Sequence, residues 1–476
     1  MAEQCTGRGA HGVVCAAAPL AAQAGAATLR AGGNAYDAVV AMALAETVLL
    51  PPKCGLGGDL VALRLEAGAH RPDALLAVGG AAEGLAAVAS GGAWRDVGPT
   101  SVGPPAAPAG YLALAARGRL SLDRLAAPAI ELAERGFPWA DVLTDLSARS
   151  VGLLEEMQPD GCTYLPGGAP IAAGAVVRLP GLAAALAELV ERRDDVLAGP
   201  LGEAIVSAVR AHGGVLTRDD LIRHGGAEWA PCAEGAAGPY RAWATPAPTM
   251  GPALLHAVAG AAPGDDAGDV YRRVLDAVAT ARETLSDPGG TSMVSAIDGD
   301  GTVVVVVHSN SYPRFGSGIV VPGYDLVLNN RAGRGFTPTP GHPNFPVAGR
   351  RPATTLHAWM VADEDGLPHL AGATPGGDNQ MPWNAQLLGQ VVAGCRDPGR
   401  LVVSPRWEWV PATDGVRVEA GLPAGEVAVL GATAPKVVRR PYWALRSAQQ
   451  VVRLPRAGEA FTGAADPRTV GCALGV

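Results

Sequence analysis

The chain has 476 residues, of which 48% are hydrophobic, so it can bury a large core and is not expected to be disordered. A formal net charge of −8 argues against a general nucleic-acid binder, because such proteins carry an excess of basic residues. The 7 cysteines and 9 histidines show no CxxC or HExxH spacing, which gives no indication of a metal site and favours reduced thiols in the cytoplasm.

The first part of the chain, up to about residue 230, is predicted to be rich in helices. The apolar stretch 13–29 imitates a signal peptide, but no basic cluster precedes it, and it contains Gln23. We expect instead a strand that turns into an alanine-rich helix, and no apolar run is long enough for a membrane span. Apolar residues at helical spacing predict further helices, and Thr217 is expected to cap another; the predicted helices cover 36–49, 120–136, 182–195 and 201–214.

After about residue 285 the pattern changes to short apolar strands and glycine-rich turns. Strands are predicted at 292–298, 302–309, 318–323 and 325–330, and the segments beyond residue 400 are interpreted as further strands and turns that close the core. Helices followed by strands indicate sheets whose outer faces are covered by helices.

The stretch 288–310 reads as a buried hairpin that begins at Thr291, directly after Pro288-Gly289-Gly290. If residues 298–301 form the loop, Ile297 pairs with Thr302, and Thr291 lies opposite His308, give or take one register step. Directly opposed side chains are about 5 Å apart at Cβ, so a threonine hydroxyl would meet a polar cluster. From this stretch alone, Thr291 is more readily interpreted as an ordinary strand residue after a turn.

A series of motifs, in order over roughly residues 11–400, supports a functional interpretation of the stretch 288–310. The motifs are the block 29–60 with its GLGG turn, "ELAERGFP" (131–138), the block 199–221, "GGTSMVSAIDGDG", "FGSGIVVPG" (315–323), "LNNRAGRGF" (328–336), "RRPATTL" (350–356) and "TPGGDNQ" (374–380). Together they resemble the γ-glutamyltransferase family of N-terminal nucleophile hydrolases. The resemblance implies an α+β fold, a four-layer αββα sandwich.

The resemblance also implies that the chain cuts itself between Gly290 and Thr291. The products would be a large fragment, 1–290, and a small fragment, 291–476, which stay intertwined as an αβ heterodimer. A threonine hydroxyl needs an adjacent base, and the freed α-amine, with a reference pKa of about 7.7–8, is suited to that task near neutral pH. This chemistry requires no metal and no organic cofactor; the expected partner is a small-molecule substrate, with neither nucleic acid nor membrane involved.

Further roles follow from matching positions. Gly376 and Gly377 match the glycine pair whose N–H groups form an oxyanion hole, although a plain turn explains them too. Asn310 joins the catalytic set. The residues predicted to bind substrate are Ser292, His308, Ser309, Arg331, Arg334, Thr354, Thr355, His357 and Asp378. Both histidines are also interpretable as structural, and both arginines as residues of a surface loop.

The sequence departs from the family pattern for recognising glutamate. The segment expected to supply an arginine, 75–84, has none, and the segment expected to supply an acid, 329–336, carries arginines instead. Loss of one half of a charged recognition pair typically costs several kcal/mol of binding. We therefore predict a non-glutamyl substrate that bears carboxylates, which a guanidinium binds in a bidentate manner.

The sequence of these segments resembles instead a divergent branch of the family. That branch includes proteins like oxamate amidohydrolase and cephalosporin acylase, and the actinomycete homologues of alkylproline-antibiotic pathways (lincomycin and pyrrolobenzodiazepine types), which are thought to cleave a carbon–carbon bond. We predict hydrolysis of an acyl bond in specialised biosynthesis, either a C–C bond that releases a short oxalyl-type group or an amide. A conventional γ-glutamyl hydrolase or transpeptidase, and a catalytically silent binding protein, remain as alternatives.

Overall fold

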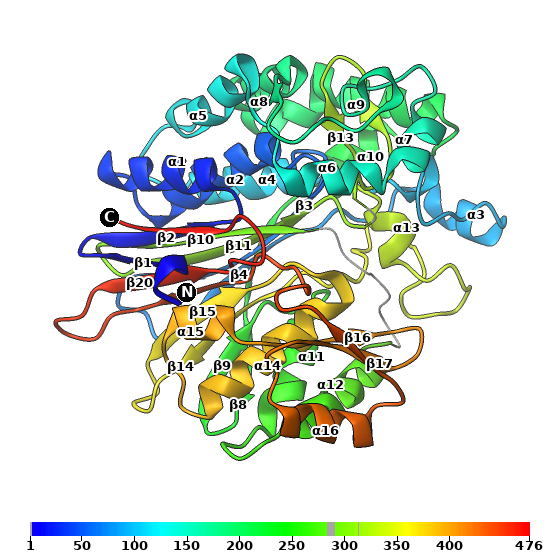
Figure 1. Cartoon of the computed structure of the whole chain (residues 1–476). Coiled ribbons are helices and arrows are strands. Elements are labelled where there is room, and N and C mark those ends of the chain that lie inside the picture. Colours follow the sequence, from blue (N-terminus) through cyan, green and yellow to red (C-terminus); the bar gives the residue numbers. More distant parts are fainter. Residues whose placement is uncertain (1, 283–290, 313) are drawn as a thin grey trace.

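Two sheets lie face to face at the centre of the molecule, and helices cover the outer face of each (Figure 1). A computed structural model describes residues 2–282, 291–312 and 314–476. In these residues each central sheet has 7 strands. The four layers confirm the αββα architecture expected from the sequence.

We name the two sheets by their places in Figure 1. The upper sheet has the order β21 (Cys472–Gly475), β2 (Gly12–Ala16), β10 (Ser292–Asp298), β11 (Val303–Ser309), β3 (Asp59–Leu65), β4 (Asp73–Ala77) and β7 (Glu228–Pro231). The lower sheet has the order β1 (Thr6–Gly9), β20 (Phe461–Ala465), β19 (Gln450–Arg453), β15 (Pro368–Ala373), β14 (Ala358–Ala362), β9 (Tyr240–Ala244) and β8 (Ala233–Ala237).

The apolar core is divided by the layers. Along β11, Val304 and Val306 belong to the cluster under the upper helices, whereas Val303, Val305 and Val307 belong to the cluster between the sheets. Successive side chains of a strand point to opposite faces, so a strand that is buried on both faces is apolar throughout. This explains the unbroken valine run, and each buried valine contributes about 1.5–3 kcal/mol.

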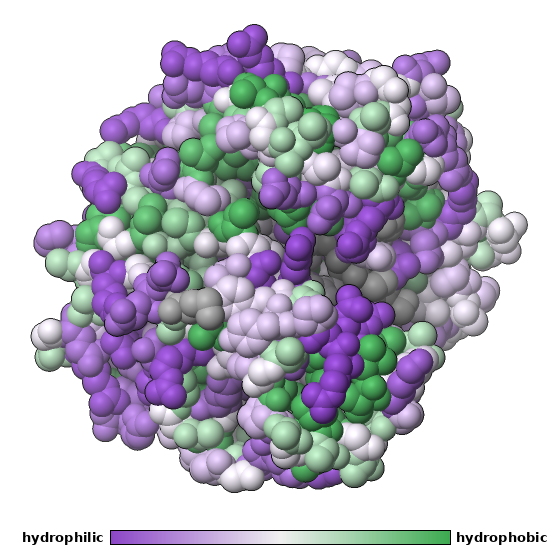
Figure 2. Space-filling model, in the orientation of Figure 1, coloured by the Kyte–Doolittle hydropathy of each residue, from purple (hydrophilic) through white to green (hydrophobic). Residues whose placement is uncertain are grey.

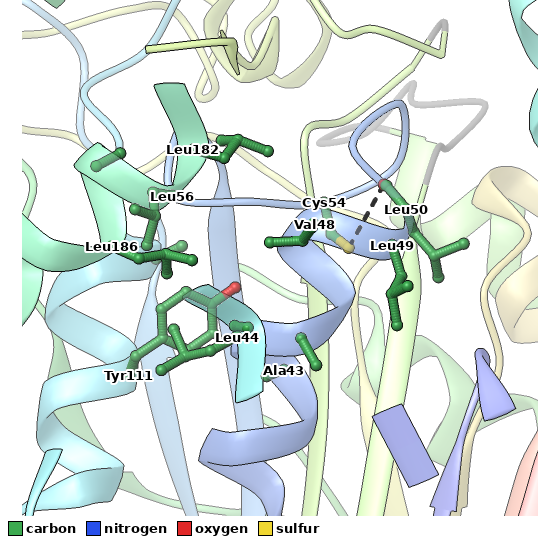
Figure 3. Packing of buried hydrophobic residues seen from close by; sticks show 14 of the residues in the cluster. Ala43, Leu44, Val48, Leu49, Leu50, Cys54, Leu56, Tyr111, Leu182 and Leu186 are labelled. Atoms are coloured by element: carbon green, nitrogen blue, oxygen red, sulfur yellow. Dashed lines mark hydrogen bonds between the residues drawn. The ribbon is translucent and has the colours of Figure 1, made fainter. Parts of the chain in front are cut away.

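Helix α2 (Ala35–Leu49) is buried along its whole length behind β10. The side chain of Asn34 and that of Asp37 form a capping box at its start. Figure 3 shows Ala43, Leu44 and Val48 of α2 among side chains from α4 (Ala107–Ala115) and α8 (Pro180–Arg192). A helix buried between a sheet and other helices needs no polar face, which explains its composition.

The remaining helix predictions in the first half are confirmed within a few residues. Helices α1 (Pro19–Arg30), α5 (Leu122–Arg135), α9 (Pro200–Ala211) and α10 (Arg218–His224) occupy the expected segments, and Thr217 caps α10. The prediction of strands and turns beyond residue 400 is partly wrong. Short strands β16 (Trp407–Val410), β17 (Gly415–Glu419) and β18 (Val437–Arg440) are present, but α15 (Pro398–Val403) and α16 (Ala424–Thr433) are helices.

Helices α11 (Gly251–Ala259), α12 (Ala267–Arg282), α14 (Gln380–Val392) and α16 lie on the lower side of the molecule (Figure 1). Helix α16 buries Val427 and Leu430, and its short run of mostly apolar residues, interrupted by Gly425 and Gly431, shows no clear helical period.

The hairpin register differs from the prediction by one step. Ile297 pairs with Val303, and Ser292 pairs with His308. The amide of Gly301 donates to the carbonyl oxygen of Asp298 at 3.0 Å, and Gly301 has a φ of 92°, as in a three-residue hairpin loop with glycine in the left-handed region. Thr291 therefore lies next to Ser309 of β11 rather than opposite His308.

Figure 2 shows hydrophilic residues over most of one face, with hydrophobic patches between them. Large exposed apolar side chains come from separate segments: Val176, Ile222, Val347, Leu367, Val438, Tyr442 and Val470. Among the helices of the described ranges, none combines the length and the apolar character that a membrane crossing requires.

Candidate active site

Thr291 lies between the two sheets, at the start of β10. Met293, two residues further on, belongs to the cluster between the sheets, and the alternation of a strand puts the side chain of Thr291 on the same face. Thr291 is 3% exposed, and its hydroxyl donates to Oγ of Ser309 at 3.3 Å. In the unbroken chain its nitrogen belongs to the amide with Gly290; that residue, and with it the predicted cleavage point, lies outside the described residues.

A glycine pair from the lower sheet lies across from Thr291. Gly376 and Gly377 follow β15, and their φ values are 145° and 59°, in the region that favours glycine. A Cβ on Gly376 would lie 2.4 Å from the ring of Trp383, so no side chain fits at this position. The backbone conformation and the close packing both require glycine here, which fits a segment that presents N–H groups to a ligand oxygen.

Gln380, the first residue of α14, connects the glycine pair with Thr291. Its side-chain amide lies 3.4 Å from Oγ1 of Thr291 and 3.3 Å from Oγ1 of Thr355. With its oxygen turned toward Gly377, this amide accepts from the Gly377 N–H at 3.2 Å and donates to the carbonyl oxygens of Thr355 and Thr374. The N–H of Gly377 thus already binds a carbonyl-type oxygen close to the Thr291 hydroxyl.

Ser292 and His308 lie on the opposite face of the sheet from Thr291, under α2. Oγ of Ser292 donates to Oε2 of Glu46 at 2.6 Å, and Nε2 of His308 lies 3.0 Å from the same oxygen. The hydroxyl of Tyr111 lies 2.8 Å from Nδ1 of His308, and the amide of Ala17 donates to Oε1 of Glu46 at 2.7 Å. We call Ser292, Glu46, His308 and Tyr111 the buried network.

This placement corrects the expectation that Ser292 and His308 line the substrate pocket. Both side chains are fully buried on the reverse face, so they influence Thr291 only through the backbone of β10. Glu46 and Tyr111 were not among the site residues predicted from the sequence. Glu46 is the only acid in the second half of an otherwise apolar helix, and an acid buried there requires a partner, which was an available signal.

Among Thr354, Thr355 and His357, the hydrogen bonds of the described residues connect Thr355 to Thr291, through Gln380. Thr354 accepts from the amide of Leu356 within its own turn. Nδ1 of His357 lies 2.8 Å from the carbonyl oxygen of Thr355, and its Nε2 lies 2.8 Å from Nδ2 of Asn384. Burial lowers the pKa of His357 to about 4, so the ring is neutral and acts as a packed hydrogen-bonding group.

Ser309 and Asn310 form the polar end of β11. Oγ of Ser309 accepts from Thr291 and from the amide of Ser311 at 2.9 Å. The amide of Asn310 donates to the carbonyl oxygen of Lys53 at 2.8 Å, and its Nδ2 donates to the carbonyl oxygen of Pro51 at 3.1 Å. A Cβ on Gly58 would lie 2.4 Å from the carbonyl oxygen of Ser309, so the GLGG turn serves close packing against this strand end.

The two predicted carboxylate-binding arginines already have carboxylate partners. Arg331 is fully buried, not on a surface loop, and its Nε donates to Oδ2 of Asp59 at 2.7 Å. Nη1 of Arg334 donates to Oδ2 of Asp96 at 2.8 Å. Asp378 follows Gly377 directly and is partly exposed, and its contact with a substrate stays a prediction.

Glu46, Cys54 and His308 are the one group in the described part of the chain whose donor atoms lie within 4.8 Å of one another, as metal ligands would. Tyr111 and Glu46 already contact both ring nitrogens of His308. Burial raises the pKa of Cys54 well above its usual range, and its thiol donates to the carbonyl oxygen of Leu50 (Figure 3). This group is best explained as hydrogen-bonded packing.

Comparison with known proteins shows the family to which the chain belongs. Residues 21–267 and 272–476 match the model of the gamma-glutamyltranspeptidase family. The chain is 29% identical to the Acylase ACY 1 proenzyme of Pseudomonas sp. (strain SE83), over 91% of this chain and 88% of that protein. It is 28% identical to the oxamate amidohydrolase proenzyme of Klebsiella pneumoniae subsp. pneumoniae, over 98% of each chain.

The crystal structure of cephalosporin acylase from Bacillus halodurans has a TM-score of 0.88 with this chain at 27% identity, and the match covers 99% of this chain and 97% of that one. This similarity confirms the fold expected from the motifs, that of the N-terminal nucleophile hydrolases. On the matched residues and the shared fold, the chain belongs to the gamma-glutamyltranspeptidase family of hydrolases.

Proposed function

We propose that this chain is a self-processing threonine hydrolase that removes a short acyl group from a non-glutamyl, carboxylate-bearing intermediate of specialised biosynthesis, such as an antibiotic pathway. The observation that carries the proposal is the position of the Thr291 hydroxyl, between Ser309 on its own sheet and Gln380, the first residue of helix α14. The N–H of Gly377 binds the same Gln380 side chain. In this proposal, the nucleophile begins a strand of the upper sheet, and the oxyanion donor follows β15 of the lower sheet.

In the proposed processing step, Oγ1 of Thr291 attacks the carbonyl carbon of Gly290. The peptide bond is exchanged for an ester, the threonine nitrogen takes up a proton, and water then hydrolyses the ester. The products are the fragments 1–290 and 291–476 of one intertwined αβ unit. The new α-amine, with a reference pKa of about 7.7–8, becomes the base for the later reaction.

In the proposed catalytic step, the α-amine takes the hydroxyl proton while Oγ1 attacks the substrate carbonyl. The N–H groups of Gly376 and Gly377 stabilise the oxyanion, and a single preorganised donor of this kind typically contributes about 3–4 kcal/mol. Collapse of the intermediate expels an amine or a stabilised carbanion, which takes the proton from the ammonium group. Water then releases the acid from the acyl ester on Thr291.

The substrate class follows from what the chain lacks and from its relatives. Residues 75–84 contain no arginine for a glutamyl α-carboxylate. One relative of nearly equal length is named as an amidohydrolase of oxamate, and others are named acylases. An oxalyl-type group, attached to the rest of the substrate through a C–C bond or an amide, is consistent with the names of these relatives. The scattered cysteines of the sequence favour a reducing, cytoplasmic location for the reaction.

The proposal is tested by intact mass measurement of the purified protein, followed by trapping. We expect two fragments with a junction between residues 290 and 291, and a mass increase on the small fragment after brief exposure to an oxalyl amide or an oxalyl ketone. The substrate that gives the ester and turns over identifies the bond. A single intact polypeptide that hydrolyses either compound would refute the threonine mechanism.

The alternative of a conventional γ-glutamyl enzyme rests on the family itself. A chromogenic γ-glutamyl anilide separates the two functions, because robust turnover of it would overturn the argument from residues 75–84. Processed protein that turns over neither the anilide nor oxalyl compounds, yet binds one of them, would support a silent binding protein.

A further inference from the structure

The cations around the candidate site differ in whether the protein supplies them with a carboxylate. Asp59 pairs with Arg331, and Asp96 pairs with Arg334. Lys53 and Arg314, in contrast, have no carboxylate within ion-pair distance among the described residues. Lys53 is also unusual as one of two lysines in the chain, the other being Lys436.

Two backbone hydrogen bonds hold the segments of Lys53 and Arg314 together. The amide of Phe315 donates to the carbonyl oxygen of Pro52 at 2.9 Å, and the amide of Asn310 donates to that of Lys53 at 2.8 Å. Residues 52–53 are thus attached to both Asn310 and Phe315. The segment 310–315 begins directly after Ser309, whose hydroxyl accepts from Thr291. The two cations therefore lie on adjoining segments beside the proposed nucleophile.

The surroundings of Lys53 disfavour its charge. Burial lowers the pKa of its ammonium group, and the nearby Arg314 lowers it further, whereas Cys54 and Glu46 act in the opposite direction. Both Lys53 and Arg314 are partly exposed as residues, so solvent or a ligand reaches them. The guanidinium of Arg314 also lies 5.2 Å from the ring centre of Tyr312, which restricts its position.

Two like charges held close together, with no carboxylate in ion-pair contact among the described residues, are stabilised by an anion from outside. Asn310 adds a polar group to the same place, because its buried Oδ1 has no hydrogen-bond donor among the residues that the structure describes. An acyl substrate that carries a carboxylate would supply the missing negative charge.

We propose that Lys53 and Arg314 form the binding site for the substrate's carboxylate, next to the carbonyl group that Thr291 attacks. This proposal rests on the proposed function for the identity of the reaction, but the anion site itself is separately measurable. It replaces Arg331 and Arg334 as the candidate carboxylate anchors, because those two arginines are already neutralised by Asp59 and Asp96.

The kinetic test compares oxamate with its neutral isostere oxamide in the processed enzyme. Lys53→Met and Arg314→Met should each raise the KM for oxamate, or the inhibition constant of oxalate, about tenfold, equivalent to ~1.4 kcal/mol. The constants for oxamide should stay within twofold. Lys53→Arg should restore most of the affinity, and Lys436→Met, at an exposed lysine, is the matched control that should change nothing. Equal effects on oxamate and oxamide, or no effect on either, would overturn the proposal.

A second readout needs no catalysis. Because the chain has two lysines, reductive methylation followed by peptide mass spectrometry reports on Lys53 and Lys436 separately. Oxalate should slow methylation of Lys53 several-fold in wild-type protein, oxamide should not, and Lys436 should be indifferent to both. This readout also serves if Lys53→Met fails to fold.

The two proposals fail in different ways. Protection of Lys53 by oxalate in a protein that hydrolyses no oxalyl compound would leave the anion site intact and refute the proposed reaction. Hydrolysis of oxamate with Lys53 unprotected, and with normal kinetics in Lys53→Met, would refute the anion site alone. Intact mass of each variant shows whether processing still takes place.

Discussion

Replacing Glu46 with glutamine should weaken both the stability of the chain and its processing. The carboxylate accepts from Ala17 at 2.7 Å and from Ser292 at 2.6 Å, and it lies 3.0 Å from Nε2 of His308. Hydrogen bonds to a buried charged group contribute about 1.5–3 kcal/mol each. Glutamine keeps one acceptor oxygen but turns an amide toward the remaining donors, so at least one bond is lost and one buried donor is left unsatisfied. We expect a loss of about 3 kcal/mol.

The stability measurement is best made in a Thr291→Ala background, where the chain is expected to stay uncut and unfolding concerns a single polypeptide. Urea unfolding of this protein, with and without Glu46→Gln, gives the shift in midpoint. Processing is measured separately, with Thr291 present, as the rate at which the full-length band disappears. Because Ser292 follows Thr291 directly, loss of its anchor should slow cleavage at least tenfold.

His308→Gln serves as the companion substitution, and the double variant should lose less stability than the sum of the two single losses, because both remove the same contact. A Glu46→Gln protein with an unchanged midpoint and a wild-type rate of cleavage would refute the idea that the buried network supports the start of β10. Additive losses in the double variant would show that Glu46 and His308 act independently.

Further predictions concern the site itself. Thr291→Ala should abolish cleavage and turnover, measured by intact mass and by product release; a variant that still splits would contradict the mechanism. Gly376→Ala should reduce kcat at least a hundredfold, because a Cβ there would lie 2.4 Å from the ring of Trp383; near-normal kcat would exclude this segment from the oxyanion hole. Burial lowers the pKa of His357 to about 4. The unfolded histidine binds its proton near pH 6.5, so the stabilisation from this residue is complete above that pH and is lost, by about 3 kcal/mol, as the pH falls toward 4. His357→Gln should flatten this part of the acid-unfolding curve, and an unchanged curve would show that the ring is not buried in its neutral form. Gln380→Met should lower kcat rather than raise KM, and an effect confined to KM would place Gln380 in substrate binding alone.

The sequence predicted the layers and the candidate nucleophile, but not the face on which each polar side chain lies. Helix α2, the hairpin and the glycine pair each have a local signal: an apolar helical run, a turn motif between alternating residues, and glycines at positive φ. The prediction for His308 depended on the register. A shift of one residue exchanges the two faces of a strand, so His308 joined Ser292 under the helices instead of Thr291 between the sheets.

Contacts between distant segments could not be predicted from the sequence. Gln380 contacts Thr291 although 89 positions separate them in the sequence, and Glu46 contacts Ser292 over a separation of 246 positions. Nothing in local periodicity specifies such pairs, because they arise from how the two sheets and α2 pack. The same is true of Arg331: its charge predicted a role in binding, and only the fold shows that Asp59 already neutralises it.

The position of β10 within its sheet has a consequence for the new chain end that cutting before Thr291 would create. Ends of polypeptides usually fray, because the first residues have few partners. Here the end would begin an inner strand of the upper sheet, because β10 lies between β11, which it pairs with from Ser292 onward, and β2, which it pairs with from Val294 onward. The amine freed by cleavage would thus be held in place by a sheet that forms before the cut. Two halves produced from separate genes would instead have to form that sheet together.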